Sequence, residues 1–494
     1  MPARGTRLAF RADSRCFIGR AARVAGAALL LAGAALQSGC GLSVRNGPIN
    51  AALAEVPGDA PVEAAPARSE SNFEDTVVGL SFSGGGTRAA AFAFGVLREL
   101  SRTQISSGDQ TSALIDQVDL VSSVSGGSVT AAYFALKGKA IMEDFEAKFL
   151  SQDVEESLRT SVSPLNIVRL TSGGVNDSTG LQSWLDENLF KNATFGDVLR
   201  RRRPALWINA SDIYNRTPFV FNQSTFGALC SDLSTLPLSE AVAASAAVPI
   251  VFAPVVIRNY GDRCQSPMPE WAERALGNSN SPAILRANAE AIKRYREHSD
   301  VKYVKLLDGG LTDNLGLTGM LLARLGANAP YEPMSEREAV RMRRLLFIVV
   351  DAGRPPGGDW AKSVNTDASD LIQAVADTAV DANVRNTYDT FAAQLKSWNR
   401  ELVDWRCKLP LEKARAMLDT NRTWNCKDLS FHVVKVTFEQ MPDRSVRDTL
   451  EQIPTRFKIK KENIDLLLDS AGAILRRNSA FQRFLAFDES RGIN

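Results

Sequence analysis

The chain has 494 residues, of which 45% are hydrophobic, 23% charged and 7% aromatic, a composition typical of a globular protein with a large core. The formal net charge is +2, but residues 1–39 hold six arginines and one aspartate, so the rest of the chain carries −3. A mildly acidic chain with dispersed charge lacks the basic surface that nucleic-acid binding needs, and no internal repeat indicates an array architecture.

The first 39 residues resemble a bacterial lipoprotein signal peptide. Six arginines precede a short apolar run, VAGAALLLAGAAL, and small residues then lead to Cys40. The apolar run is shorter than a membrane-spanning helix requires. Gln37 stands where lipoprotein signal peptides usually have leucine. We expect cleavage before Cys40, its lipidation, and anchoring at the periplasmic face or outer membrane of a bacterium. The alternatives are an ordinary cleaved signal and a retained N-terminal anchor.

Export changes what the remaining cysteines are expected to do. With Cys16 removed and Cys40 lipidated, four remain, and an oxidising compartment favours disulfides between those close in sequence, Cys230–Cys264 and Cys407–Cys426. No CxxC motif or nearby histidine accompanies them, so we expect no metal site, and the sequence indicates no cofactor.

Residues 40–76 are rich in Ala, Pro, Glu and Ser and predict a flexible tether. From residue 77 to 358, short apolar runs that predict strands alternate with helical patterns. These runs are VVGLSFS, DQVDLVSSV, PALWINASDI, APVVIRN, VKYVKLLDGG and RLLFIVVDAG. The alternation predicts an α/β core with a mainly parallel sheet covered on both faces, and functional groups just beyond strand ends.

Residues 359–494 have a more helical pattern. One or two long amphipathic helices are expected from Asp367 to Leu402, a strand over DLSFHVVKVTFEQ and a final helix over KKENIDLLLDSAGAILRRN. No linker rich in Pro, Gly or Ser separates this part from the core, so we predict a helical C-terminal extension packed on the same domain.

The segment LVSSVSGGSVTAAYF, residues 120–134, contains the candidate nucleophile. A serine exposed on a sharp strand-to-helix turn needs small residues two positions before and after it. Ser125 meets this condition through Ser123 and Gly127, with Gly126 between, whereas Ser128 falls within the helix. The pattern resembles a G-x-S-x-G elbow whose first glycine is replaced by Ser123. A mere tight turn is the alternative.

Three consecutive glycines, Gly84, Gly85 and Gly86, follow the first predicted strand in SFSGGGTR. Their amides, together with the positive end of the following helix, can stabilise a negative oxygen, as an acyl-transfer nucleophile requires. A nucleotide phosphate loop fits less well, because neither GxxxxGK[ST] nor GxGxxG spacing is present. We expect Arg88 to shape this loop or to pair with a carboxylate.

The chain has only two histidines, and neither has the sequence context of a catalytic base. His298 lies in a charged segment and His432 on a late strand, although the order Ser125, Asp, His432 leaves a Ser–His–Asp esterase open. A carboxylate can act instead if burial raises its pKa. Asp308 ends an apolar strand before two glycines and is the favoured candidate, with Asp313 and Asp351 as competitors.

The ordered motifs GGGTR, SVSGG and DGG, together with LSEAVAASAAVPIVFAPV, resemble the patatin-like phospholipase family over roughly Val77 to Gly319, plus the strand at Arg344–Gly353. The resemblance implies a three-layer α/β/α sandwich and a Ser–Asp dyad without histidine. By position it assigns Ser125 as nucleophile and Asp308 as base, with Gly84–Gly86 and Arg88 forming the oxyanion loop. Ser123 departs from the elbow glycine and puts substrate preference in doubt.

The expected function is therefore hydrolysis of lipid carboxylic esters, phospholipids among them, by an exported lipoprotein that needs no metal. Two alternatives belong to other classes. The fold could bind lipid or a partner without catalysis, or the glycine loop could bind a nucleotide. The sequence indicates neither the lipid head group nor the oligomeric state.

Overall fold

The computed structural model describes residues 47–53, 73–107, 110–158, 176, 179–249, 251–264, 267–297, 300–355, 368–418 and 424–486. The expected signal peptide, Cys40 and His298 lie outside these residues.

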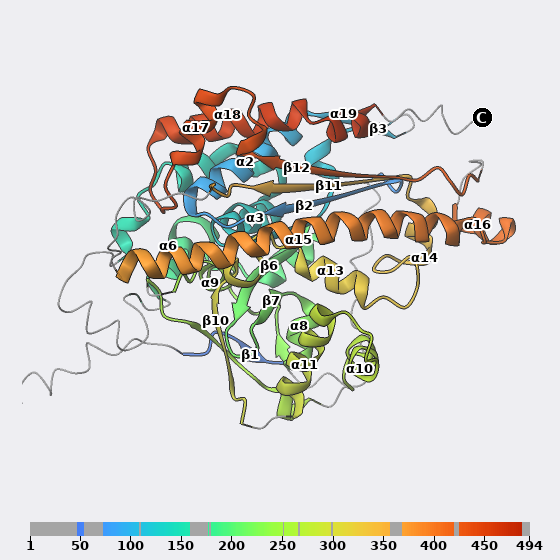
Figure 1. Cartoon of the computed structure of the whole chain (residues 1–494), viewed down its shortest axis with the longest axis horizontal. Coiled ribbons are helices and arrows are strands. Elements are labelled where there is room, and N and C mark those ends of the chain that lie inside the picture. Colours follow the sequence, from blue (N-terminus) through green and yellow to red (C-terminus); the bar gives the residue numbers. More distant parts are fainter. Residues whose placement is uncertain are drawn as a thin grey trace, which may run out of the picture.

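The centre of the molecule is an eight-stranded sheet (Figure 1). Its strand order is β12 (Ser430–Thr437), β11 (Arg344–Asp351), β2 (Thr76–Phe82), β5 (Val118–Val124), β6 (Ala205–Asp212), β10 (Tyr303–Asp308) and β9 (Val255–Arg258), with β7 (Thr217–Phe221) also paired to β6. The first five strands are mutually parallel, whereas β10, β9 and β7 add antiparallel pairs at one side. The expectation of a mainly parallel sheet is confirmed.

Burial on both faces explains why the strand sequences are continuously apolar rather than alternating. In β11 every residue is buried. Leu346, Ile348 and Val350 face one helical layer, and Leu345, Phe347 and Val349 face the other.

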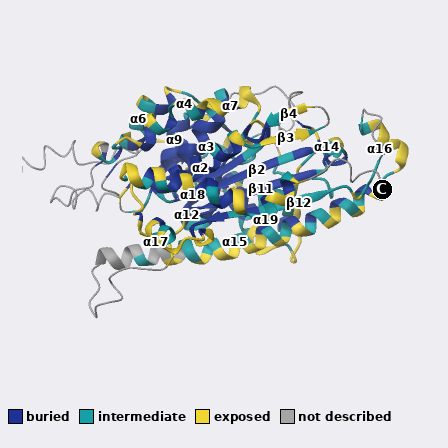
Figure 2. Ribbon diagram, turned by 90° about the horizontal axis from the view of Figure 1, so that it is seen from above, coloured by how far each residue is buried: buried dark blue, intermediate teal, exposed yellow. Residues whose placement is uncertain are grey.

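The two helical layers complete an α/β/α sandwich. Helices α2 (Gly86–Arg102), α3 (Gly126–Lys137) and α18 (Lys461–Arg477) share the hydrophobic core on one face, and α13 (Thr318–Leu325) and α15 (Ala368–Arg406) pack on the other (Figure 1). Figure 2 shows β2 and β11 buried between these layers, whereas α15 exposes its outer side. The three-layer expectation is confirmed.

The C-terminal part contributes to both the sheet and a helical layer. It supplies the edge strand β12, the single 39-residue helix α15, and α18, which packs along α2. At Gly95 of α2 an added Cβ would lie 2.7 Å from the Leu468 carbonyl oxygen, so the two helices touch backbone to backbone.

The remaining described elements are short and surround the sandwich. The strands form two small antiparallel pairs, β3 (Gln104–Ser107) with β4 (Gln110–Ala113) and β1 (Ala51–Ala52) with β8 (Ser231–Asp232). The helices are α4 (Ile141–Phe145), α6 (Thr179–Leu185), α7 (Phe195–Arg201), α8 (Gln223–Ala228), α9 (Leu238–Ser245), α10 (Glu270–Gly277), α11 (Ala283–Glu297), α12 (Gly310–Asp313), α14 (Glu336–Arg341), α16 (Leu411–Leu418), α17 (Arg444–Gln452) and α19 (Ser479–Leu485).

Residues 47–53 lie against the core, although the sequence predicts a flexible tether there. The Ile49 amide donates to the Val256 carbonyl (3.0 Å) and the Leu53 amide to the Cys230 carbonyl (2.9 Å). The Asn50 side chain hydrogen-bonds to both the amide and the carbonyl of Arg258. These backbone bonds fix the segment along the sheet edge, a contact that composition does not predict.

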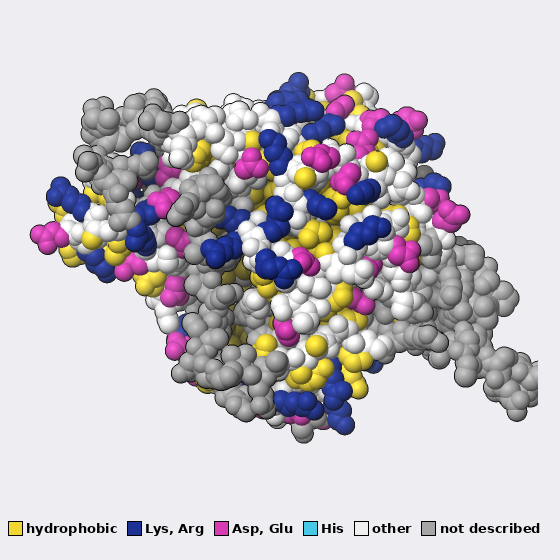
Figure 3. Space-filling model, turned by 180° about the vertical axis from the view of Figure 1, so that it is seen from behind, with side chains coloured by type: hydrophobic (Ala, Val, Ile, Leu, Met, Phe, Trp, Pro, Cys, Tyr) yellow, Lys and Arg dark blue, Asp and Glu magenta, His cyan; other side chains and the backbone are white. Residues whose placement is uncertain are grey.

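The structure joins Cys230 to Cys264 and Cys407 to Cys426, the two pairs that sequence proximity favours, with Cα–Cα distances of 5.6 and 4.9 Å. Figure 3, the view from behind, shows basic and acidic side chains interspersed over that face. Among the described helices, none is both long and apolar enough to cross a membrane.

Candidate active site

Ser125 occupies a strained turn between β5 and α3. Its backbone has φ 51° and ψ −123°, a region that residues with a side chain rarely adopt, and its side chain is buried at 5% exposure. Two glycines permit the turn. A Cβ at Gly126 would lie 2.0 Å from the Gly86 carbonyl oxygen, and one at Gly127 would lie 2.5 Å from that of Ser83. This is the geometry of a nucleophile elbow.

Asp308 reaches Ser125 because of the register around β6. Val124, the last residue of β5, pairs with Asn209 of β6, and Asp308 pairs with the next residue, Ala210. Strand β10 runs antiparallel to β6 and ends at this level, so its last side chain lies beside the elbow. The Ser125 hydroxyl lies close enough to the Asp308 carboxyl to lower its pKa.

Burial governs the ionisation of Asp308. Loss of solvent raises its pKa from the ordinary 3.8 to about 6, although the hydrogen bond from the Gly310 amide (2.8 Å) and the nearby Ser125 hydroxyl act in the opposite direction. A carboxyl with this pKa is ionised at neutral pH and remains basic enough to accept a hydroxyl proton.

The triple-glycine loop lies against the elbow. The Gly84 amide donates to the Asn314 carbonyl (3.2 Å), and a Cβ at Gly84 would lie 3.4 Å from that of Ser125. Among the described residues, no acceptor is bonded to the amides of Gly85 or Gly86, which begin α2. These two amides are therefore available to an oxyanion, whereas the Gly84 amide already donates a hydrogen bond to Asn314.

Arg88 lies inside the protein at 3% exposure, and its Nη1 donates to the Ile453 carbonyl at 2.7 Å. The side chain thus supports the glycine loop from within, in keeping with the shaping role considered from sequence.

Ser245 at the end of α9 links the three strands of the site. Its hydroxyl accepts from the Ser125 amide (2.8 Å) and donates to the Asn209 carbonyl (2.6 Å), while its own carbonyl accepts from the Gly309 amide (3.1 Å). Asn209 in turn donates to the Ser122 hydroxyl and the Ser123 carbonyl. Sequence reasoning missed both roles, although Ser245 stands in the Ala/Ser-rich stretch that carries the family resemblance.

The competing candidates lie elsewhere. Asp313 is fully buried and accepts from the Thr318 amide, and Asp351 pairs with Lys435 at 3.3 Å. His432 lies on edge strand β12, three strand spacings (about 14 Å) from β5. Its Nε2 contacts the Ser430 hydroxyl at 3.2 Å. Burial, and to a smaller extent the positive charge of Arg483, lowers the pKa of the His432 imidazole. Of Asp308, Asp313, Asp351 and His432, only Asp308 lies beside Ser125 in the described structure.

The elbow residue Ser123, which departs from the family glycine, is buried and donates to the Trp207 carbonyl of the neighbouring strand (3.3 Å). The sheet therefore accommodates its hydroxyl without displacing Ser125. Across the described ranges, no group of three or more His, Cys, Asp or Glu side chains is placed to hold a metal ion.

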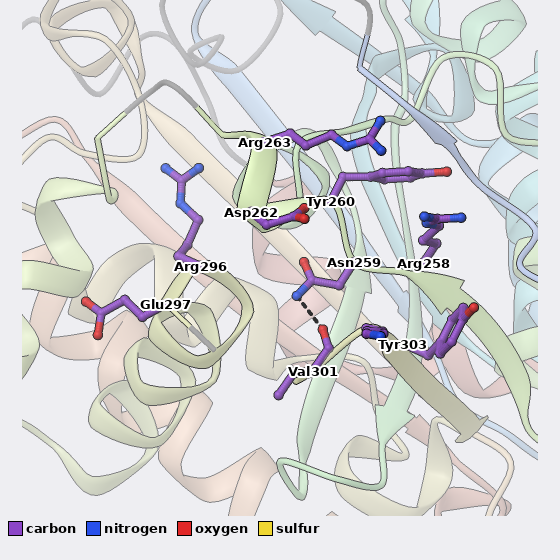
Figure 4. Close-up of a pocket in the computed structure, with 10 residues that line it drawn as sticks. Arg258, Asn259, Tyr260, Asp262, Arg263, Arg296, Glu297, Val301 and Tyr303 are labelled. Atoms are coloured by element: carbon purple, nitrogen blue, oxygen red, sulfur yellow. Dashed lines mark hydrogen bonds between the residues drawn. The ribbon is translucent and has the colours of Figure 1, made fainter. Parts of the chain in front are cut away.

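A cavity of about 420 Å³ lies at the other end of β10 (Figure 4). Four cations line it, Arg258, Arg263, Arg296 and Lys302, together with Asp262 and Glu297. Tyr303, which begins β10, is one of its walls, and five residues of strand (about 17 Å) separate it from Asp308. This cavity is therefore distinct from the Ser125 site.

Residues 80–321 match the family model described as patatin-like phospholipase, and the chain therefore carries a domain of the patatin-like phospholipase family. No curated protein matches the chain.

The solved structures to which the chain is similar include one bacterial and one human protein. VipD from Legionella pneumophila is 11% identical, with 83% of this chain and 67% of that chain covered and a TM-score of 0.33. Human GIVD cytosolic phospholipase A2 is 14% identical, with 84% and 63% covered and a TM-score of 0.35. The chain thus spans less than two thirds of the human protein.

Replacing Asp308 by Asn should stabilise the protein more as the pH rises. Burial raises the pKa of Asp308 in the folded protein from the ordinary 3.8 to about 6. The contribution of this carboxyl to folding stability is therefore complete below about pH 3.8, and it is lost as the pH rises through about 6. Ionising the buried carboxyl costs about 3 kcal/mol at pH 8. We expect the Tm difference between Asp308→Asn and the wild type to grow from pH 4 to pH 8. Asp116→Asn, at an exposed position, is the control. A difference independent of pH would contradict the assignment.

Replacing Ser245 by Ala should lower kcat by about tenfold or more, because it leaves the buried Ser125 amide without its acceptor and loosens the elbow. Ser239→Ala is a matched control. Ser239 lies on the same helix, is fully buried, and its hydroxyl has no hydrogen-bond partner in the described structure. Its replacement should leave kcat within about twofold. Equal kcat and Tm for the two variants would refute the role of Ser245.

Proposed function

We propose that the protein is a serine lipid acyl hydrolase in which Ser125 is the nucleophile and Asp308 the general base. The observation that carries the proposal is the contact of the strained Ser125 with a single buried carboxyl of raised pKa, beside two amides without bonded acceptors. The patatin-like phospholipase match indicates lipid carboxylic esters, phospholipids among them, as the substrate class.

The reaction follows from this arrangement. Asp308 accepts the hydroxyl proton while Ser125 Oγ bonds to the ester carbonyl carbon, and the amides of Gly85 and Gly86 bind the oxygen that becomes negative. When the tetrahedral species collapses, the alcohol leaves with the proton from Asp308. A water molecule then gives a proton to Asp308 and attacks the acyl-serine. When this second tetrahedral species collapses, the fatty acid leaves and Asp308 returns the proton to Ser125 Oγ, which restores the serine and the carboxylate.

Two of the alternatives left open by the sequence, a Ser–His–Asp esterase and a binding protein without catalysis, have less support. A Ser–His–Asp mechanism would need an imidazole at Ser125, and His432 instead contacts Ser430 and packs 5.8 Å from the Phe484 ring. A binding protein without catalysis would have no need for strain at Ser125 or for a buried carboxyl of raised pKa beside it, both of which cost stability.

Ester hydrolysis by the purified protein tests the proposal. Ser125→Ala and Asp308→Asn should each lower kcat at least about a thousandfold, whereas His432→Ala should retain wild-type activity. Because Asp308 must be ionised to accept the proton, kcat/KM should rise with pH and level off above a midpoint near 6. Activity that survives Ser125→Ala, or that is lost in His432→Ala with folding intact, would overturn the dyad.

We also propose that the protein is an exported lipoprotein anchored through Cys40. The sequence pattern supports this, and residues 47–53 are fastened to the core beside Arg258. The eight residue steps from Cys40 to Pro48 reach at most about 29 Å, which would hold that side of the domain near the membrane. In cells fed a labelled fatty acid, the wild type should incorporate the label and Cys40→Ser should not. Equal labelling would exclude this anchor.

A further inference from the structure

The glycine loop is held by a segment from the other end of the chain. Residues 453–457, in the connection between α17 and α18, lie against the start of α2. The Arg456 carbonyl accepts from the Thr87 amide at 2.9 Å, and the Ile453 carbonyl accepts from Arg88 Nη1 at 2.7 Å. A Cβ at Gly86 would lie 2.6 Å from the Arg456 oxygen, so the two backbones are in direct contact.

These contacts flank the two available amides. On one side the Gly84 amide is fixed by Asn314, and on the other the Thr87 amide is fixed by Arg456. Gly85 and Gly86 have φ angles of 135° and 60°, values that glycine adopts freely, so the loop needs outside contacts to hold one conformation. The Arg88 guanidinium lies beneath the loop, since its Nη2 would be 3.1 Å from a Cβ at Gly85.

The 453–457 segment is itself fixed at both ends. Ile453 is buried, and the Phe457 amide donates to Glu155 Oε1 at 3.0 Å. The Phe457 ring meets the Phe252 ring edge-on with centroids 6.4 Å apart. Beyond it, α18 packs along α2 itself. A shift of this segment would therefore move the first turn of α2 and its amides.

We infer that the 453–457 segment is a positioning element of the active site, and that it sets the Gly85 and Gly86 amides for the oxyanion through Arg88 and Thr87. The segment lies outside residues 80–321, which match the family. Arg88 is in this account a positioning residue that does not touch substrate. The inference rests on the proposed acyl hydrolase function.

Two substitutions approach the segment from opposite sides. Arg88→Met removes the guanidinium that donates to Ile453 and leaves an unbranched apolar side chain in its place. Phe457→Ala removes the ring that packs against Phe252 and so loosens the segment. Each should lower kcat by about 10- to 100-fold with KM changed less than about threefold, because misplaced amides affect the transition state alone. Binding of a trifluoromethyl ketone, whose adduct places an oxyanion on the same amides, should weaken by a similar factor.

Three further readouts separate positioning from general damage. The pH midpoint near 6 should be unchanged, because Asp308 is not disturbed, and Arg88→Lys should recover part of kcat by keeping a donor. Arg98→Met is the matched control. Arg98 also lies on α2 and also contacts α18, through Asp469 at 2.6 Å, but three helical turns from the glycine loop. Its replacement should leave kcat within about twofold.

The outcomes are distinct. If Arg88→Met and Phe457→Ala are folded and keep kcat within about twofold, or lose no more than Arg98→Met does, the inference is wrong although the dyad can stand. If the wild type hydrolyses no ester, or Ser125→Ala is as active as the wild type, the proposed function itself fails and the positioning role fails with it.

Discussion

The approach of the Ser125 hydroxyl to the buried Asp308 carboxyl is the interaction on which the proposed site depends. It exists because β6 lies between the two strands that carry these residues, parallel to one and antiparallel to the other. Burial at 9% exposure makes the carboxyl a stronger base than it would be in water, and the same burial disfavours its charge in the folded protein. The proposed role of Asp308 as a base and the loss of folding stability when it ionises therefore have the same cause, its burial.

Close backbone contact is the second constraint. The elbow, the triple-glycine loop and the 453–457 segment lie so close together that an added Cβ at Gly126 or Gly86 would overlap a carbonyl oxygen. Side chains would separate the nucleophile from the amides that are proposed to stabilise its intermediate. The glycines at these positions thus allow the chain segments to approach one another closely, and they also allow the turns.

The sequence predicted the strands and the layers well, since runs such as RLLFIVVD are apolar on both faces and indicate a covered sheet. It also indicated Ser125 and Asp308, because each stands at the end of a strand beside glycines. It could not show that β10 runs antiparallel and stops at the level of Ala210, since direction and register depend on pairing across nearly a hundred residues. Nor could it find Ser245 or Arg456, whose roles come from one hydroxyl and one backbone carbonyl with no motif of their own.

The most direct measurement is the site and pH dependence of labelling by a fluorophosphonate, followed by peptide mass spectrometry. The account predicts a single covalent adduct on Ser125, formed at a rate that falls as the pH drops below about 6 and abolished by Asp308→Asn. An adduct on another serine, or a Ser125 adduct formed equally fast with and without the Asp308 carboxylate, would contradict it.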